Sequence, residues 1–345
     1  MYIVIPIFSD GFIHQLHEKN KLSLLYVKQL NGVGKMLQIN HMDTLEKQSY
    51  DFLIDSTIIT TDAKKLLTIH PFKNVYDINI LNWWIDNKPL SEDVKNNAID
   101  YMNNKYYNMK NVNYIIPSVK HLEWCDEVSK DIEQVWAKKD TIDFENYKQY
   151  NEEVVVAFTS IEKHGVKVVD NICDIFDIRV KKHISDGKLY SNYNLTTSTG
   201  RPSNAFGTVN FAALNNAQRR AFVPKNDLFI EYDYDAYHLR LIGDFIGYKF
   251  PQASVHEYLA SFYGSTYEES KQITFKLLYG GISDKIAKSI PFFRKIKHYI
   301  NEKWSEYNLN KFVSTDIYNR KLTQNNHQDM NRNKLFNYLI QAYET

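Results

Sequence analysis

Three segments of one stretch decide the fold of this chain: LFIEYDYDAYHLRLIGDFI at 228–246, VHEYLASFYG at 255–264 and EESKQITFKLLYGG at 268–281. The first segment begins with residues that alternate between two faces, which predicts a half-buried strand, and turns to helical spacing at Tyr237. Asp233 therefore falls at the carboxyl end of the strand, where a carboxylate can reach a cation in a cleft. An ordinary surface aspartate is the alternative. Asp235 is predicted to cap the following helix.

The third segment places a lysine and two aromatic residues on one face of a predicted helix. Lys271, Phe275 and Tyr279 are four residues apart, so each is rotated by only about 40° from the one before. Gly280 and Gly281 are expected to end the helix. Such a face offers a charge for phosphate and two flat rings for a sugar and a base. The alternative is that both rings are core residues, with Lys271 lying beside them.

Five signatures, in order over about Val155 to Thr345, resemble those of family A DNA polymerases, the bacterial DNA polymerase I and phage replicative type. Their sequences are Ile161-Glu162-Lys163-His164-Gly165-Val166 with Asp170; Thr199-Gly200-Arg201-Pro202-Ser203 with Asn210 and Arg220-Ala221-Phe222; Asp233-Tyr234-x4-Leu239-Arg240 (motif A); Lys271-x3-Phe275-x3-Tyr279-Gly280 (motif B); and Asn337-x3-Gln341. Each signature alone is of moderate specificity, and their common order carries the resemblance.

The resemblance implies template-directed DNA synthesis from a dNTP onto a primer 3′-hydroxyl, by a two-metal mechanism. Asp233 and the Tyr234 carbonyl would bind Mg²⁺, and Lys271 would neutralise the triphosphate. The other implied roles, by position, are His256 at the β-phosphate, Phe275 on the sugar, Tyr279 over the nascent base pair, Arg201 and Asn210 in the primer–template minor groove, and Asn337 and Gln341 on the template side.

The sequence departs from the family pattern in several places. His238 stands where the family has a glutamate beneath the sugar 2′-position, and Tyr267 stands where it has an arginine that contacts the triphosphate; Arg240 and Lys276 are candidates to replace that arginine. Only about thirty residues separate Asp170 from Thr199, so the thumb is expected to be reduced. No His-Asp hairpin (motif C) follows Gln341 before the chain stops. The prediction is an incomplete polymerase without its second catalytic carboxylate, inactive as an isolated fragment, with a C-terminal palm fragment or a processivity factor as a possible partner.

The sequence before the five signatures favours an α/β unit. Strands are predicted at 2–7, 22–29, 52–54 and 57–60, and helices at 62–69 and 78–85. In the family a 3′–5′ exonuclease-like domain precedes the polymerase, but no Asp-x-Glu occurs between Met1 and Tyr50. An inactive exonuclease-like domain is therefore expected, with Asp62 and Asp77 as structural residues.

The fold class that results is α+β, in four parts. We expect the exonuclease-like domain at 1–110, a helical connector or reduced thumb at 111–170, a partial palm with an antiparallel sheet and motif A at 171–262, and helical fingers with motif B at 263–345. Basic residues are in excess from Ser160 onward (25 Lys and Arg against 19 Asp and Glu), as a surface that follows a nucleic-acid backbone requires.

Composition bounds the cellular setting. Cys125 and Cys173 provide neither a metal-binding spacing nor a disulfide framework. The apolar run at 2–7 is too short to span a membrane. The expected location is the cytoplasm of a bacterium or of a phage-infected cell. Two other functions stay open: a non-catalytic module that binds primer–template or single-stranded DNA, and a different nucleotidyltransferase.

Overall fold

The computed structural model describes residues 1–8, 14–17, 20, 22–38, 51–90, 119–205, 208–230, 234–251, 254–315, 317–324 and 327–344. The chain forms two compact units. Unit 1 comprises Met1–Thr197 and Pro202–Leu228, and unit 2 comprises Ser198–Arg201 and Phe229–Thr345. Among the described residues, no helix is both long and apolar enough to cross a membrane.

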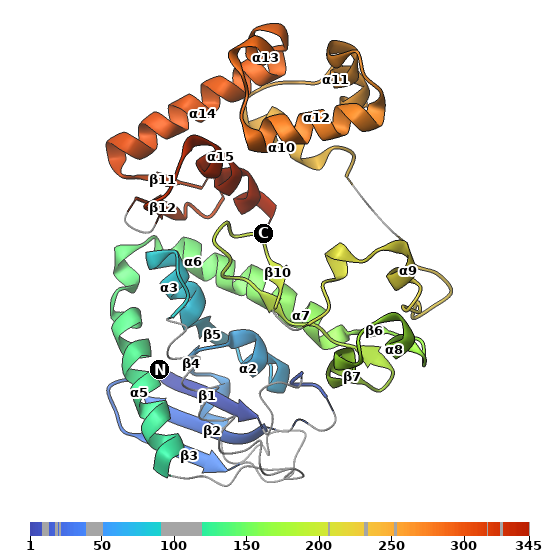
Figure 1. Ribbon diagram of the computed structural model, residues 1–345. Helices are drawn as coiled ribbons and strands as arrows, with labels where there is room; N and C mark the ends of the chain where they lie inside the picture. Colours follow the sequence, from blue (N-terminus) through green and yellow to red (C-terminus); the bar gives the residue numbers. More distant parts are fainter. Residues whose placement is uncertain are drawn as a thin grey trace. The chain divides into compact units, whose positions relative to one another are not determined.

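Unit 1 is built on a mixed five-stranded sheet with the strand order β3-β2-β1-β4-β5 (Figure 1). Three strands form an antiparallel meander, and the last two run parallel to β1. Their bounds are β1 Tyr2–Phe8, β2 Leu22–Gln29, β3 Gly34–Gln38, β4 Thr57–Thr60 and β5 Asn74–Asp77.

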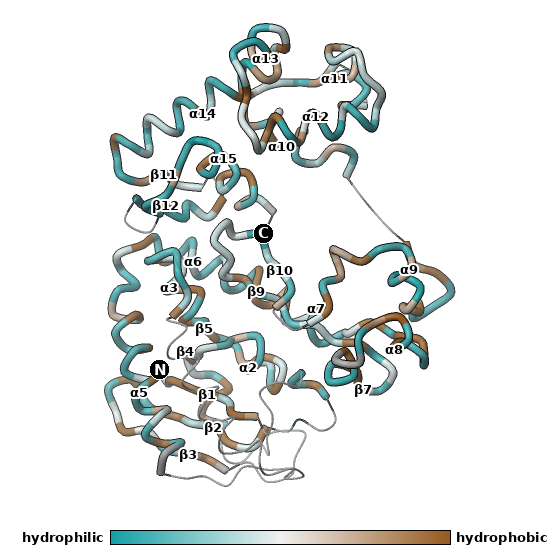
Figure 2. The backbone as a smooth tube through the Cα atoms, in the orientation of Figure 1, coloured by the Kyte–Doolittle hydropathy of each residue, from teal (hydrophilic) through white to brown (hydrophobic). Residues whose placement is uncertain are grey.

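Successive residues of β2 are buried without alternation, which indicates that both faces of the sheet are covered. Helix α5 lies against β1, β2 and β3, while α2 contacts β1, β4 and β5 and in turn packs on α7. Figure 2 shows the hydrophobic residues running along β1 and β2. The helix bounds are α1 Asp51–Ile54, α2 Ala63–Ile69, α3 Ile78–Asp86, α5 Val119–Ala137, α6 Phe144–Tyr150 and α7 Val156–His164.

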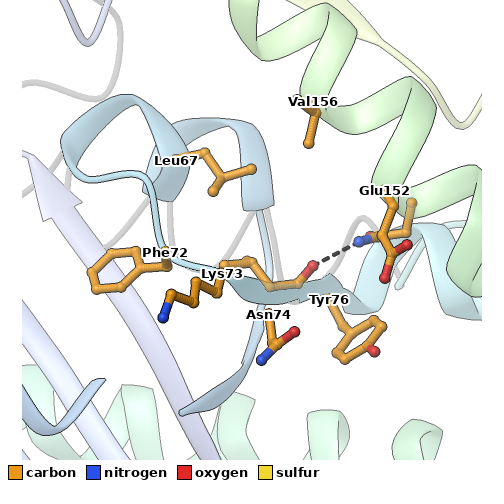
Figure 3. Close-up of a pocket in the computed structure, with 9 residues that line it drawn as sticks. Leu67, Phe72, Lys73, Asn74, Tyr76, Glu152 and Val156 are labelled. Atoms are coloured by element: carbon orange, nitrogen blue, oxygen red, sulfur yellow. Dashed lines mark hydrogen bonds between the residues drawn. The ribbon is translucent and has the colours of Figure 1, made fainter. Parts of the chain in front are cut away.

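A π-helical turn, Asn151–Val155, joins α6 to α7 without a break. It turns the side chain of Asn151 inward, where its amide donates to the Val75 carbonyl at 2.6 Å and its oxygen accepts from the Asp77 N–H at 3.1 Å. A small cavity of about 40 Å³ lies beside this contact. Its lining side chains, among them Leu67, Phe72 and Tyr76, are drawn in Figure 3. The cavity has room for about one water molecule and none for a nucleotide.

The rest of unit 1 is a small module with its own core around Ile172, Val180 and Leu189. It contains a three-stranded sheet with the order β6-β8-β7 and a separate pair, β9 and β10. The bounds are β6 Val166–Lys167, α8 Ile172–Ile175, a 3-10 helix at Ile178–His183, β7 Ile184–Ser185, β8 Lys188–Leu189, β9 Tyr193–Asn194, β10 Ser203–Asn204, a 3-10 helix at Phe211–Ala213 and α9 Asn216–Arg219.

Unit 2 is largely helical, with a short β hairpin between its last two long helices (Figure 1). Its core includes Leu259 of α11, Leu278 of α12, Phe293 of α14 and Phe336 of α15. The bounds are α10 Tyr237–Phe245, α11 Val255–Tyr263, α12 Tyr267–Gly280, α13 Asp284–Ser289, α14 Pro291–Asn310, β11 Phe312–Ser314, β12 Lys321–Thr323 and α15 Arg332–Gln341.

One strand expected from the sequence is wrong, and the described start of another has no strand structure. Residues 52–54 form the helical turn α1, in which Leu53 is buried and Phe52 is 40% exposed, because a short apolar run does not by itself distinguish a strand from a helix. Residues 228–230, the described part of the expected motif A strand, have no regular structure, and their side chains are 58–67% exposed. No neighbouring strand pairs with them in the described part of the chain, so nothing there satisfies a strand backbone.

Candidate functional site

Capping residues define both ends of helix α12. Thr266 and Glu269 form a reciprocal capping box at the N-terminus. The helix ends at Gly281, whose φ of +105° is accessible to glycine at little cost. The predicted helix and its glycine end are thereby confirmed.

Four side chains at intervals of four residues form one exposed stripe on α12. They are Tyr267, Lys271, Phe275 and Tyr279, and each of the three rings is 37% exposed. The ammonium of Lys271 lies 5.8 Å from the centroid of the Tyr267 ring, a cation–π distance. The rings of Phe275 and Tyr279 are parallel within 2°, with centroids 6.2 Å apart.

The buried side of the same helix is formed by Ser270, Thr274 and Leu278. Phe275 and Tyr279 are therefore not core residues, and that alternative is wrong. Spacing alone could not decide between the two faces, because both repeat with the helical period. The stripe also includes Tyr267, which the sequence reading noted only as the place of a missing arginine.

His256 on α11 lies beneath this stripe and is only 2% exposed. Its ring centroid is 5.5 Å from that of Tyr267 and 6.4 Å from that of Phe275. Its Nδ1 has no hydrogen-bond partner among the residues that the structure describes. Burial, and then the charge of Lys271, lower the pKa of His256, which favours a neutral ring. Because both rings cover it, a phosphate can contact His256 only if one of them moves.

The entry to α10 differs from the prediction. The N-cap is Ala236, in the left-handed region with φ +52°, and it makes no side-chain cap. The Asp235 carboxylate instead accepts from the Arg240 guanidinium at 3.0 Å, and Arg240 also donates to the Asp235 carbonyl. The predicted N-cap role of Asp235 is therefore wrong, because its carboxylate binds the guanidinium of Arg240, five residues later. Arg240, a candidate replacement for the missing arginine, is occupied by this pair.

A hydrogen bond joins motif A to motif B. The hydroxyl of Tyr279 lies 3.1 Å from Nδ1 of His238, which is 41 residues earlier in the chain. Tyr234 is 78% exposed, and its ring is 5.6 Å from that of Tyr237. Asp233 falls outside the described residues, so its distance from Lys271 stays undefined.

The expected template-side residues lie on α15, which packs against α10 and α12. The Gln341 amide donates to the Asn337 side chain at 2.9 Å, so the two act as one polar group. Tyr343, just beyond α15, packs on Phe245 with ring centroids 4.1 Å apart and planes tilted by 43°, and its carbonyl accepts from the Tyr237 hydroxyl. These contacts hold the end of α15 against α10.

The two residues expected at the minor groove belong to different units, Arg201 to unit 2 and Asn210 to unit 1. Asn210 caps a 3-10 helix through the Ala212 N–H at 3.2 Å. The segment of Arg201 is held in unit 2 by Arg320, which donates to the Thr199 carbonyl.

The basic residues of α14 mainly stabilise unit 2 itself. Lys295 donates to the Gly247 carbonyl at 2.9 Å, and Lys297 pairs with Asp284 at 2.7 Å. Lys303 pairs with Glu306 three residues on.

Asp62 and Asp77 are structural in unit 1, as expected. Asp62 caps α2 through the Lys65 N–H, and Asp77 caps α3 through the N–H groups of Asn79 and Ile80. In the parts of the chain that the structure describes, no three His, Cys, Asp or Glu side chains gather in a way that could hold a metal ion.

No family model matches the sequence, and no curated protein matches it. Among solved structures, the chain is similar to the POL domain of Pol1 from M. smegmatis in complex with DNA primer-template and dNTP. The TM-score is 0.66 at 13% identity, over 99% of this chain and 82% of that one. The fold is similar to that of a polymerase domain. At this identity the likeness concerns the fold, and it supports the α+β class expected from the sequence.

Proposed function

We propose that this chain carries out the nucleotide-binding part of template-directed DNA synthesis, in which a deoxynucleotide passes from a dNTP to a primer 3′-hydroxyl. The observation that supports this most directly is the exposed stripe of α12, where a lysine precedes two parallel rings. A triphosphate, a sugar and a base follow one another in a dNTP in the same order. The similarity of the fold to a polymerase domain supports this assignment.

The proposed contacts follow from chemistry along the stripe. Lys271 supplies a mobile positive charge to the triphosphate. Phe275 packs on the sugar, and Tyr279 stacks on the nascent base pair, where its hydroxyl is oriented by His238. We propose that His238 lies next to the sugar 2′-position as a steric gate, and its contact with Tyr279 supports this. His256 supports the rings of the stripe from below.

The DNA would lie along polar side chains outside the stripe. We propose that Asn337 and Gln341 contact the templating side, and that Arg201 and Asn210 contact the primer–template minor groove. Base pairing then supplies sequence information, while these contacts check position.

We propose that Asp233 and the Tyr234 carbonyl bind Mg²⁺. The described residues do not by themselves fit a metal site, since Asp235, the nearest described carboxylate in sequence, is paired with Arg240. Held by Asp233 and the Tyr234 carbonyl, Mg²⁺ would supply activation of the primer 3′-hydroxyl and charge stabilisation for the leaving pyrophosphate. The present residues support only binding and orientation of the nucleotide.

The test is dNTP affinity in the presence of primer–template, with the full chain and two lysine variants. Lys271→Ala should weaken dNTP binding about 10- to 100-fold, because a hydrogen bond to a charged group contributes roughly 1.5–3 kcal/mol. Lys285→Ala is the matched control, since Lys285 is an exposed lysine of α13, the next helix along the chain, and lies off the stripe. Equal effects of the two variants would refute the proposed site.

Asp233→Ala separates catalysis from binding. In an assay in which the wild-type chain incorporates dNMP, alone or with an added partner protein, the variant should lose incorporation and keep DNA affinity. If the wild-type chain binds DNA but neither incorporates nor binds dNTP, a non-catalytic DNA-binding module is the correct function.

A further inference from the structure

Tyr267 is the member of the α12 stripe that stands at the N-terminal end of the helix. The members follow one another at intervals of four residues, so about 6 Å of helix axis separates each from the next. In the proposed function, Tyr279, Phe275 and Lys271 receive the base, the sugar and the phosphates in that order. Tyr267 is therefore the side chain next to the outer end of the phosphate chain.

Contacts on two sides hold the ring of Tyr267 in this place. The ring packs on that of His256 in an edge-to-face arrangement, with centroids 5.5 Å apart and planes at 83°. On the exposed side, the Lys271 ammonium lies 5.8 Å from the centroid of the same ring. The face of an aromatic ring carries partial negative charge, so it attracts the lysine and repels a phosphate. Tyr267 thus offers no positive charge to the outer end of a phosphate chain.

The first turn of α12 is also unfavourable for an anion. A helix N-terminus usually attracts anions through its free N–H groups and its dipole. Here the Glu269 carboxylate already accepts from the Thr266 N–H at 2.9 Å and from the Thr266 hydroxyl at 3.0 Å. The exposed Glu268 stands three residues before Lys271, and hence on the same side of the helix. Two carboxylates therefore occupy the end of the helix that a further phosphate would approach.

The two basic residues that the sequence offered as replacements for an arginine at this end lie elsewhere. Arg240 pairs with Asp235 at 3.0 Å. Lys276 is nine residues from the start of the stripe, about 13 Å along the helix axis, at the end that carries the rings. Among the described groups whose charges act on the buried His256, Lys271 is the one cation. The phosphate end of the stripe therefore combines a single lysine with a negative surrounding.

We propose that the stripe recognises a nucleotide through its first two phosphates, so that it binds deoxynucleoside diphosphates about as tightly as triphosphates. The inference rests on the proposed function, whose site it uses, and it assigns the selectivity for phosphate number to Tyr267. The three N–H donors of Lys271 can contact oxygen atoms of neighbouring phosphates. A third phosphate meets the ring of Tyr267 and the carboxylate of Glu268. Repulsion by these two groups opposes its attraction to Lys271, so the third phosphate adds little to the affinity.

The experiment measures the Kd of dATP, dADP and deoxyadenosine for the full chain on a primer–template whose templating base is thymine. A chelator keeps metal ions from adding contacts of their own. In the wild type, the Kd of dADP should lie within about threefold of that of dATP, as expected where exposed charges nearly balance. Deoxyadenosine, which offers Lys271 no phosphate, should bind about 10- to 100-fold more weakly than either. A preference for dATP over dADP of about tenfold or more, as a charged hydrogen bond to the third phosphate would give, would overturn the proposal.

Substitutions at Tyr267 test its part directly. Tyr267→Arg places a guanidinium at the outer end of the phosphate chain and should make dATP bind about 10- to 100-fold more tightly relative to dADP. Ser261→Arg is the matched control, because it adds the same charge at an exposed position of α11, five residues after His256 and pointing about 140° away from it. The control should keep the wild-type ratio of the two Kd values.

Tyr267→Phe keeps the ring and removes the hydroxyl, so it should keep that ratio as well. A loss of dATP affinity at constant dADP affinity in Tyr267→Phe would mean that the hydroxyl binds the third phosphate, which contradicts the proposal. A folded Tyr267→Arg variant with the wild-type ratio would also contradict it. The wild-type ratio needs no substitution, so it decides the matter even if Tyr267→Arg does not fold.

Lys271→Ala separates failure of this inference from failure of the nucleotide site. If the variant weakens dATP and dADP binding alike, and the wild type binds both about equally, the site and the inference stand. If the variant weakens both but the wild type prefers dATP by about tenfold or more, the site stands and the inference fails. If the variant changes neither Kd, the proposed nucleotide site fails, and the inference fails with it.

Discussion

Two consecutive lysines of α2 offer a sharp test of how unit 1 is stabilised. Lys64 is 8% exposed and bonds the carboxylate of Glu162, itself 2% exposed, as well as the Tyr193 carbonyl at 2.6 Å. The Tyr193 N–H completes the network by donating to Glu162 at 2.7 Å. The neighbouring Lys65 reaches Asp62 at 3.7 Å, and both of these side chains are more than a third exposed.

Lys64→Met removes one partner of a buried ion pair and leaves the other without compensation. The expected loss is about 3–5 kcal/mol in the free energy of unfolding, because the Glu162 carboxylate then stays buried without its cation. Lys65→Met, the matched control one residue away, should cost about 0–1 kcal/mol, as exposed pairs do. The double variant Lys64→Met with Glu162→Leu should recover most of the loss.

The assay is urea unfolding at neutral pH, followed by tryptophan fluorescence. Four of the five tryptophans, Trp83, Trp84, Trp124 and Trp136, lie in unit 1, so the signal reports mainly on this unit. Burial raises the pKa of Glu162 even with Lys64 present. A carboxyl with a raised pKa in the folded state destabilises the fold as pH rises, so the loss in Lys64→Met should shrink on acidification. Equal midpoints for the Lys64→Met and Lys65→Met variants would refute this reasoning.

Four other substitutions test separate features. Burial and the nearby Asp62 raise the pKa of Asp77 to about 7, so stability should fall as pH rises from about 4 to 7, and Asp77→Asn should remove this dependence in pH-resolved urea unfolding. Burial and the nearby His183 lower the pKa of His14 to about 3, so stability should also fall as pH drops below about 6.5, and a His14→Gln variant that loses stability equally in acid would contradict this. Tyr279→Phe should weaken dNTP binding about 2- to 12-fold, since a hydrogen bond contributes roughly 0.5–1.5 kcal/mol; an unchanged Kd would mean that His238 does not orient the ring. His238→Ala should raise ribonucleotide relative to deoxyribonucleotide use, and unchanged selectivity would discard the gate.

The sequence predicted helix α12 and the alignment of Lys271, Phe275 and Tyr279 along it because these signals are local. Four-residue spacing and terminal glycines act within one helix, so neighbours need not be known, whereas the exposure of that face depends on what packs against the helix. The contact between His238 and Tyr279 is different. The resemblance gave both residues roles around one nucleotide without predicting a contact between them, and the hydrogen bond depends on where α10 lies relative to α12, which no spacing encodes.

The failures also have physical causes. The sequence at 228–235 alternates as a strand should, yet a strand forms only where another backbone pairs with it, and residues 228–230 have no such partner in the described part of the chain. Asp235 suits an N-cap by type, but Arg240 competes for the same carboxylate. The sequence also did not indicate that His256 is buried, because a histidine next to an apolar residue can have a covered or an exposed ring.

The π-helical turn at Asn151–Val155 sets the rotation of helix α7 about its axis relative to α6. A regular helix advances by about 100° per residue, so the extra residue in the turn rotates α7 by that angle relative to α6. Deleting Glu152 would restore regular α-helical bonding and swing Glu162 away from Lys64 while leaving the composition of both helices intact. The extra residue in the turn thus sets the direction in which the side chains of α7 point. It links the inward position of Asn151 to the ion pair between Lys64 and Glu162, whose glutamate lies more than ten residues later.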